Sequence, residues 1–202
     1  LGKFLLDKSL YQGFKPVLWS TVEKTALADA EVEYLDHLSS TIYTAFKVKN
    51  TDKDFLKDSN IIIWTTTPWT IPANKALAFN SNIDYSLIEI EKTDFFDKSK
   101  IVVATELVNS LISSCKINKF KILKSFKGDE LKKTTCNHPL LKLGFKHEVP
   151  LLNAGFVNLE QGTGIVHCAP SHGPDDFNLC LKNNIPSKYT VDDSGRYTKE
   201  IP

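Results

Sequence analysis

The chain has 202 residues, 42% hydrophobic and 24% charged, a balance typical of a folded globular protein that excludes intrinsic disorder as the native state. Its 25 basic residues nearly cancel its 24 acidic ones, so no strong overall field draws the chain to a polyanion. The longest apolar runs, such as residues 61–64, are far shorter than the roughly 20 residues of a membrane-spanning helix. We therefore expect no membrane partner and a cytoplasmic location.

At the start of the chain, apolar residues recur at near-helical spacing until a glycine and a proline interrupt them. Phe4, Leu5, Tyr11 and Phe14 follow this pattern, which predicts a short helix. The mixed pattern of residues 16–46 then predicts a linking region.

Two parts of that linking region have strand character. Residues 17–19 are apolar, and residues 31–34 alternate polar with apolar side chains. They predict two strands or a ribbon.

The core is expected to begin near Asn60, where a run rich in β-branched residues ends in threonines and prolines. This pattern predicts a buried strand that leads into a functional loop. Further strands are predicted at residues 85–90, 100–104, 120–126 and 164–167, helices at 106–113 and 175–181, and a hairpin turn at 191–197. Many strands with few, irregularly placed helices predict an α+β fold: a barrel-like, mostly antiparallel β core with a few flanking helices.

One stretch of the chain is dense in lysine and offers local positive charge. It contains Lys116, Lys119, Lys121, Lys124, Lys127, Lys132 and Lys133. Such a run suits a phosphate backbone, but it is more often simply a solvated face.

The first chemically suggestive segment is residues 64–74. Thr65, Thr66 and Thr67 supply hydroxyl groups that both donate and accept, and the prolines that follow restrict the loop. A rigid polar wall beside a strand end suits a hydroxyl-rich substrate. Threonines also favour strands and cap turns without any further role, so the flanking pattern carries the prediction.

The second segment is residues 162–177, in which glycines precede a short apolar strand and a polar loop. The loop brings His167, His172, Asp175 and Asp176 to one neighbourhood. A helix is expected after Pro174, and acidic residues in a first helical turn can simply complement the helix dipole.

Other classes of site fit these residues less well. The four cysteines form no C-x-x-C pair and are expected to be reduced thiols. His167, Cys168, His172 and Asp176 carry metal-binding atoms, but no H-E-x-x-H or paired-cysteine spacing supports a metal. No nucleophile elbow or P-loop motif is present. We expect neither metal nor cofactor.

At the two segments, the sequence resembles the editing domain, or CP1 insertion, of class I aminoacyl-tRNA synthetases for branched aliphatic amino acids, of bacterial type. Residues 11–17 and 25–34 resemble the ribbon that leads into this insertion. Valyl and leucyl versions typically carry T-T-R-P in the threonine loop, whereas this chain has Thr67-Pro68-Trp69-Thr70, so the isoleucyl member is favoured.

The resemblance covers essentially the whole chain and implies its organisation. Residues 1–50 would be a helix and ribbon that link to an absent catalytic domain, and residues 51–202 would be the editing core with a C-terminal return hairpin. The chain starts at Leu1 and contains no methionine, so it is expected to be a piece of a longer protein. No HIGH or KMSKS signature occurs, so ATP-dependent aminoacylation is not expected in these residues.

The resemblance also implies roles for single residues. Asp176 would hold the α-ammonium group of valine, and His167 would close the pocket to isoleucine. The three threonines would bind the ester, its adenosine or the attacking water, without a division of labour among them. The expected catalytic residues are Thr66, Thr67, His167 and Asp176, and the expected substrate-binding residues are Thr65, Trp69, Asn74, His172 and Asp175. Cys168 and Ser171 depart from the threonine and the small residue expected there.

The implied activity is hydrolysis of valine wrongly attached to tRNA(Ile), with valyl-adenylate as a further substrate. A second sieve is needed because one methylene group provides only about 1–3 kcal/mol of discrimination; isoleucyl-tRNA synthetase is itself the standard example of this limit. The expected partners are the 3′ aminoacylated end of tRNA(Ile), its valine moiety and the rest of the parent synthetase, with the chain a monomer. A module that binds the tRNA end or amino acid without hydrolysis, and an independent metallohydrolase, are the alternatives.

Overall fold

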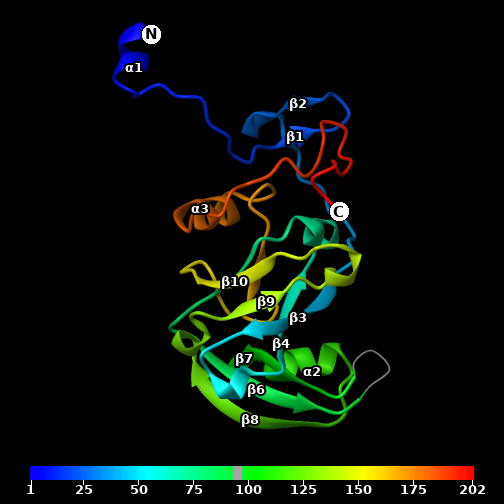
Figure 1. The fold of residues 1–202 in the computed structure, drawn as a ribbon. Helices are drawn as coiled ribbons and strands as arrows, with labels where there is room; N and C mark the ends of the chain where they lie inside the picture. The colour runs from blue at the N-terminus through cyan, green and yellow to red at the C-terminus, as the bar shows by residue number, and fades with distance from the viewer. Residues whose placement is uncertain (93–96) are drawn as a thin grey trace.

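One nine-stranded sheet organises the chain in the computed structural model, which describes residues 1–92 and 97–202 (Figure 1). Its strands are β3 (Ile42–Asn50), β4 (Ser59–Thr65), β5 (Ala76–Phe79), β6 (Asp84–Ile90), β7 (Ser99–Ala104), β8 (Phe120–Lys127), β9 (Thr135–Asn137), β10 (Glu148–Asn153) and β11 (Val166–Cys168). A separate two-stranded ribbon consists of β1 (Trp19–Ser20) and β2 (Thr25–Ala26).

Helices are few and short. The α-helices are α1 (Gly2–Leu6), α2 (Val108–Ser114) and α3 (Pro174–Lys182). The 3₁₀ helices are η1 (Asp29–Glu31), η2 (Asp54–Leu56), η3 (Pro68–Ala73), η4 (Thr105–Leu107), η5 (Gly128–Leu131) and η6 (Leu141–Leu143). The predicted α+β class is confirmed.

The strands of the large sheet follow the order β11-β5-β10-β9-β3-β4-β7-β6-β8. Most neighbours are antiparallel, as predicted, and the β4–β7 and β5–β10 pairs are parallel. The sheet is open, so the expectation of a barrel-like core does not extend to a closed barrel. β11 and β8 occupy its two edges, and β8 carries lysines that discourage pairing with a further strand.

The main core lies between the central strands and α2. β4 buries Ile61, Ile62 and Ile63 completely or almost completely, because β-branched side chains pack well on a pleated surface covered on both faces. Val108 and Leu111 of α2 complete this cluster. α2 thereby packs against the central strands of the sheet.

A second, smaller cluster fastens α3 to the edge of the sheet. Leu179 and Cys180 of the helix pack with Ala76 and Ala78 of β5 and with Cys168 of β11. The small alanine side chains let the helix approach the strands closely. This packing sets the N-terminus of α3 beside the end of β11, where the candidate site lies.

The predicted core elements are found where the sequence indicated them: β4, β6, β7, β8, β11, α2 and α3. The hairpin turn is also present, with a bridge between Val191 and Tyr197. Strands β5, β9 and β10 were not predicted. β3 was not predicted either: it joins the sheet, although residues 42–50 lie in the part of the chain that was expected to link to a catalytic domain. The domain boundary at residue 50 stays a prediction.

The N-terminal expectations are partly wrong. The helix ends at Leu6 instead of continuing towards Phe14, and all its residues are exposed, so nothing packs to extend it. Residues 31–34 are not a strand, because no neighbouring strand pairs with them. Figure 1 shows α1 at the end of an extended segment, apart from the sheet.

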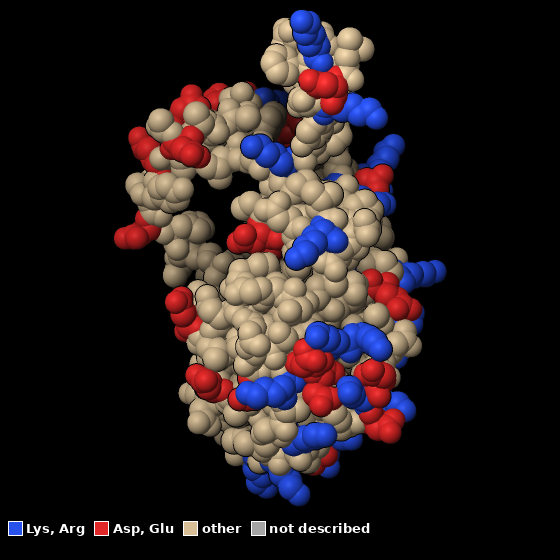
Figure 2. Space-filling view, turned by 90° about the vertical axis from the view of Figure 1, so that its left-hand side faces the viewer, with Lys and Arg blue, Asp and Glu red and all other residues tan. Residues whose placement is uncertain are grey.

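The lysine-dense stretch lies on β8 and the segments that flank it, at the opposite edge of the sheet from β11. Lys127 pairs with Asp84, Lys119 with Glu91 and Lys132 with Asp129. In Figure 2 the basic and acidic groups are interspersed over the visible face. This arrangement favours the solvated-face interpretation. Within the described ranges, no helix is long and apolar enough to span a membrane.

Candidate functional site

The two segments singled out by the sequence meet at one end of the sheet. β4 ends at Thr65, the chain turns through η3 into β5, and β5 pairs antiparallel with β11, which carries His167. β11 in turn leads to the N-terminus of α3, where Asp176 lies in the first turn. The fold therefore gathers residues about one hundred positions apart in the sequence.

The threonine loop is held by its own hydroxyl groups. The backbone N–H of Thr67 donates to Thr65 Oγ1 at 3.0 Å, and the two hydroxyl oxygens are 3.2 Å apart. Thr70 Oγ1 donates to the carbonyl of Thr67 at 2.8 Å. Thr65 and Thr70 are buried and Thr67 is exposed, so these bonds form a fixed polar wall that runs from the buried end of β4 to the surface.

His167 is 8% exposed and uses both ring nitrogens within the protein. Asn74 Nδ2 lies 3.0 Å from Nδ1 and 2.9 Å from the carbonyl of Ala76, to which it donates, so the amide group must also be the donor to Nδ1. Nε2 then carries the proton and donates to Thr70 Oγ1, 2.7 Å away. Burial, then the neighbouring histidines 138 and 172, lower the pKa of His167 to about 4, so the ring is neutral at pH 7.

Asn74 is completely buried and lies behind His167, so it acts on the cavity only through that ring. Its Oδ1 atom has no hydrogen-bond partner within residues 1–92 and 97–202. The amide cannot be rotated to relieve this, because Oδ1 would then face the carbonyl oxygen of Ala76. The orientation of the amide thus fixes the tautomer of His167.

Asp176 provides a carboxylate at the other side of the site. Its Oδ2 accepts from the backbone N–H of Ala169 at 2.8 Å. Burial raises the pKa of Asp176 to about 6, despite the bond from Ala169, so the group is ionised at pH 7 but poorly solvated. A cation that reaches it gains a charge-assisted contact.

A cavity of about 200 Å³ lies among these groups. It is lined by Trp64, Thr65, Thr67, Thr70, Val166, His167, Ala169, His172 and Asp176. The cavity thus combines the neutral ring of His167 and the carboxylate of Asp176 with threonine hydroxyl groups and apolar side chains.

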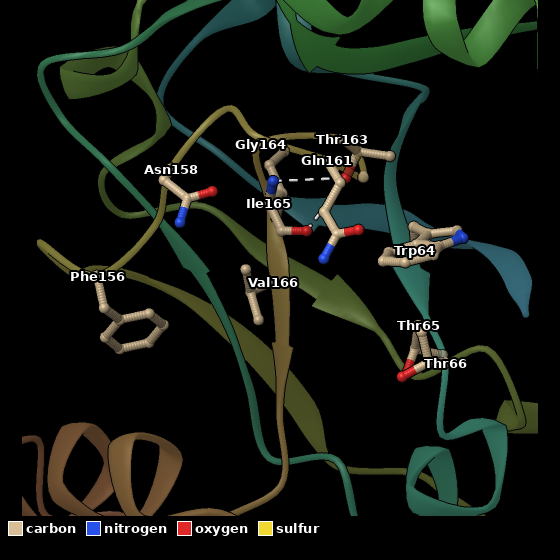
Figure 3. A pocket seen from close by; sticks show the side chains of 11 residues that line it. Trp64, Thr65, Thr66, Phe156, Asn158, Gln161, Thr163, Gly164, Ile165 and Val166 are labelled. Carbon is tan, nitrogen blue, oxygen red and sulfur yellow. Dashed lines mark hydrogen bonds between the residues drawn. The ribbon is translucent and has the colours of Figure 1, made fainter. Parts of the chain in front are cut away.

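A second cavity, of about 250 Å³, adjoins the first and shares Trp64, Thr65 and Val166 with it. Figure 3 shows Trp64 to Thr66 on one side of Val166, the first residue of β11, and of Ile165 just before it, with Phe156 and Asn158 on the other side. Gln161 also lines this space. It combines two aromatic side chains with two amide groups.

The remaining predicted residues lie at the margins. Thr66 lines the second cavity only, and Trp69 is 53% exposed and packs edge-on against His172, with ring centroids 5.2 Å apart. Tyr197 of the C-terminal hairpin donates to the carbonyl of Trp69 at 2.6 Å. Asp175 is exposed and lines neither cavity.

Four residues that line the first cavity were given no role from the sequence: Trp64, Thr70, Val166 and Ala169. Thr70 has a detectable signal, because a threonine three residues after Thr67 meets it in a 3₁₀ turn. Trp64 and Val166 belong to strands, where only the pairing decides which face looks into the site.

Glycines shape the loop that precedes β11. Gly162 has a φ of +85° and faces the Trp64 ring. Gly164 has a φ of +71°, and a Cβ atom there would lie 2.4 Å from that of Ala104. Glycine is therefore needed at both positions for the close approach of this loop to its neighbours.

Within residues 1–92 and 97–202, no three or more His, Cys, Asp or Glu side chains are grouped so that they could hold a metal ion. All four cysteines are free and buried. The cavities described above are built instead from hydroxyl, amide, imidazole and carboxylate groups.

Comparison with known proteins places these features in a family. No family model matches the chain. The isoleucine–tRNA ligase of Pelagibacter ubique is 62% identical over 202 residues, and that of Gluconobacter oxydans is 44% identical over 208. Both alignments cover the whole chain but only 22% of the relative, so the chain spans about a fifth of the length of these ligases.

Solved structures show the same fold at low sequence identity. The CP1 domain of GlLeuRS has a TM-score of 0.54 at 15% identity, covering 80% of this chain and 69% of that one. The editing domain of the Plasmodium falciparum (P. falciparum) cytosolic leucyl-tRNA synthetase has a TM-score of 0.52 at 18% identity, covering 72% and 68%. The chain is thus a segment of the isoleucine–tRNA ligase family that has the fold of a synthetase CP1 editing domain.

Proposed function

We propose that this chain hydrolyses the ester bond of valine wrongly attached to tRNA(Ile), and that it leaves correctly attached isoleucine intact. The observation that carries the proposal is the 200 Å³ cavity, which places the ionised Asp176 and the neutral, fixed ring of His167 around one small space. An aminoacyl group needs both features: a counter-charge for its ammonium group and a wall that measures its side chain.

Asp176 is proposed to bind the ammonium group of valine. A carboxylate has about four acceptor positions, so it can accept from the ligand and still hold the N–H of Ala169. Since burial raises its pKa, the carboxylate is less solvated than a surface group and gains more from a cation.

His167 is proposed to exclude the longer side chain of isoleucine. Because both nitrogens are bonded, the ring cannot swing aside without breaking bonds to Thr70 and Asn74. A wall held in this way turns one additional methylene group into a steric clash, which discriminates more strongly than a lost contact.

The second cavity is proposed to hold the terminal nucleoside of the tRNA. The first cavity is smaller than the roughly 300–1,000 Å³ typical of sites for drug-sized ligands, so an aminoacyl group fits it better than a whole aminoacyl-nucleoside. Trp64 and Phe156 offer faces for a base, and Asn158 and Gln161 offer amide groups for its edge. The ester would then lie between the cavities, beside Thr65.

In the proposed reaction, water attacks the ester carbonyl, and valine and the free tRNA end are released. Thr65 and Thr67 orient the water and the ester through their hydroxyl groups. His167 does not take the proton, since Nδ1 accepts from Asn74 and Nε2 is already protonated. We propose that a hydroxyl group of the terminal ribose instead passes the proton from the attacking water to the leaving oxygen of the tRNA. Valyl-adenylate carries the same ammonium and side chain and is proposed as a second substrate.

The test is deacylation of Val-tRNA(Ile) and Ile-tRNA(Ile), measured with this chain and with the Pelagibacter ubique ligase in which this chain replaces the matching segment. Hydrolysis of the valyl ester with the isoleucyl ester spared is expected. Binding of both tRNAs without hydrolysis would show a binding module instead. Activity that a chelator removes and zinc restores would show a metallohydrolase.

A further inference from the structure

The 3₁₀ helix η3 is held from outside by two histidines that the proposed reaction does not use. His138 Nε2 lies 3.0 Å from the carbonyl oxygen of Ile71, and His147 Nε2 lies 2.9 Å from that of Asn74. A carbonyl can only accept, so each ring donates from Nε2. The two rings are neighbours, with centroids 5.1 Å apart.

His138 is built into the protein as firmly as His167. It is 1% exposed, its ring stacks on Phe145 at 4.7 Å, and its Nδ1 accepts from the backbone N–H of Leu140 at 3.1 Å. Burial lowers the pKa of His138 to about 4, so the ring stays neutral with its proton on Nε2. A buried, neutral histidine with both nitrogens bonded is a fixed donor.

The two bonds meet at Asn74. The N–H of Asn74 donates to the Ile71 carbonyl, which also accepts from His138, while the carbonyl of Asn74 accepts from His147. The side chain of Asn74 then holds Nδ1 of His167. The peptide group after Asn74 is therefore bonded directly to His147, and the one before it shares its acceptor, the Ile71 carbonyl, with His138. His138 and His147 are called the histidine pair.

We infer that the histidine pair positions His167, and so sets how strictly the cavity excludes isoleucine. The two residues do not line the cavity and touch no reacting atom, so they are positioning residues. Exclusion of isoleucine by His167 matters only if the chain hydrolyses aminoacyl esters, so this role rests on the function proposed above. Loss of the bond from His138 or His147 should therefore change the ratio of the two deacylation rates, instead of lowering both rates equally.

Matched substitutions separate the donor from the ring. His147→Phe and His138→Phe keep an aromatic side chain and remove the donor, whereas His147→Gln and His138→Gln keep an N–H group that can reach the carbonyl. His37, which is exposed, serves as the control through His37→Phe and His37→Gln. Each variant is made in the 202-residue chain and in the Pelagibacter ubique ligase that carries it.

Two measurements are made on each variant: the ratio of Val-tRNA(Ile) to Ile-tRNA(Ile) deacylation, and the imidazole ¹⁵N chemical shifts of His167 in the 202-residue chain. The phenylalanine variants are expected to lower the ratio about fivefold each, the effect of one ordinary hydrogen bond. They should also shift the His167 resonances away from a single Nε2–H tautomer. The glutamine variants should restore most of the ratio, and the His37 variants should match the wild type.

The outcomes separate the two proposals. If the wild type hydrolyses neither ester, the proposed function is wrong, and the ¹⁵N shifts alone then decide whether the pair positions the ring. If the phenylalanine variants keep both the wild-type ratio and the wild-type His167 shifts, the positioning role is wrong. Equal loss of both rates with unchanged shifts would mean that the histidine pair only stabilises the fold, and it too would overturn the inference. Thermal unfolding of each variant confirms that the folded protein is compared.

Discussion

Replacement of Asp176 by asparagine should make the protein more stable and less active. Asparagine has nearly the same shape and keeps an oxygen for the N–H of Ala169. It removes only the charge, which burial disfavours, since the pKa rises from an ordinary 3.8 to about 6. This difference corresponds to about 3 kcal/mol of unfolding free energy that the ionised group costs at neutral pH.

The stability difference between Asp176→Asn and the wild type should depend on pH. Between pH 3.8 and about 6 the folded state binds more protons at Asp176 than the unfolded state, so the group's contribution to stability falls as pH rises and is lowest above pH 6. Asp176→Asn should therefore be more stable than the wild type at pH 7.5, by up to about 3 kcal/mol, with the difference shrinking towards pH 4. Asp175→Asn, which removes an exposed charge from the same helical turn, should lower stability by about 0.3–1 kcal/mol at most.

The assays are urea unfolding at several pH values and deacylation of Val-tRNA(Ile). Loss of a charge-assisted contact to the ammonium group should lower kcat/KM by about 10- to 100-fold in Asp176→Asn. A variant that is no more stable at pH 7.5 would contradict the account of a poorly solvated carboxylate. A variant with full activity would contradict its role in binding.

Three further results are expected. His167→Ala should open the cavity and raise hydrolysis of Ile-tRNA(Ile) by about 10- to 200-fold, and an unchanged rate would rule out the steric role. The kcat/KM for Val-tRNA(Ile) should fall about tenfold per pH unit below pH 6, as Asp176 becomes protonated. Asp176→Asn should abolish that slope, and a wild type without the slope would refute the role of the Asp176 carboxylate in binding. Gly164→Ala should lower the unfolding free energy by about 1–3 kcal/mol in urea, because its φ is +71° and its Cβ would meet Ala104, whereas Gly155→Ala meets nothing within 4 Å and should change little; equal effects would contradict the packing argument.

The sequence predicted strands best where β-branched residues cluster, as in β4, and poorly where other signals dominate. β5 is a four-residue run, Ala76–Phe79, that is fully buried and therefore lacks alternation. β3 does alternate, with Phe46 and Val48 buried and Lys47 and Lys49 exposed, so the sequence carries a strand signal in a region that we expected to be a linker. Residues 31–34 alternate equally well yet form no strand, because a strand also requires a partner.

The candidate site was predictable as two segments but not as a geometry. The residue pattern gave four polar candidates in the second segment, and the family resemblance singled out His167 and Asp176 among them; the fold brings both to one cavity with Thr65 and Thr67. Which threonine hydroxyl points inward depends on the turn of η3, which local patterns do not determine. The histidine pair lies more than sixty residues from the carbonyls that it holds, so only the pairing of β9 and β10 with the rest of the sheet could reveal it.

The side-chain amide of Asn74 donates to two buried acceptors, and its Oδ1 atom is buried with it. Within the described part of the chain this buried oxygen has no hydrogen bond, which costs about 1–3 kcal/mol. An apolar side chain of similar size would avoid that cost, but it would leave Nδ1 of His167 and the carbonyl of Ala76 without their donor, and each of these buried acceptors would then cost a similar amount. The cost of one unpaired oxygen is therefore smaller than the cost of removing it. Residue 74 is thus expected to resist apolar replacement even in a search for stability alone.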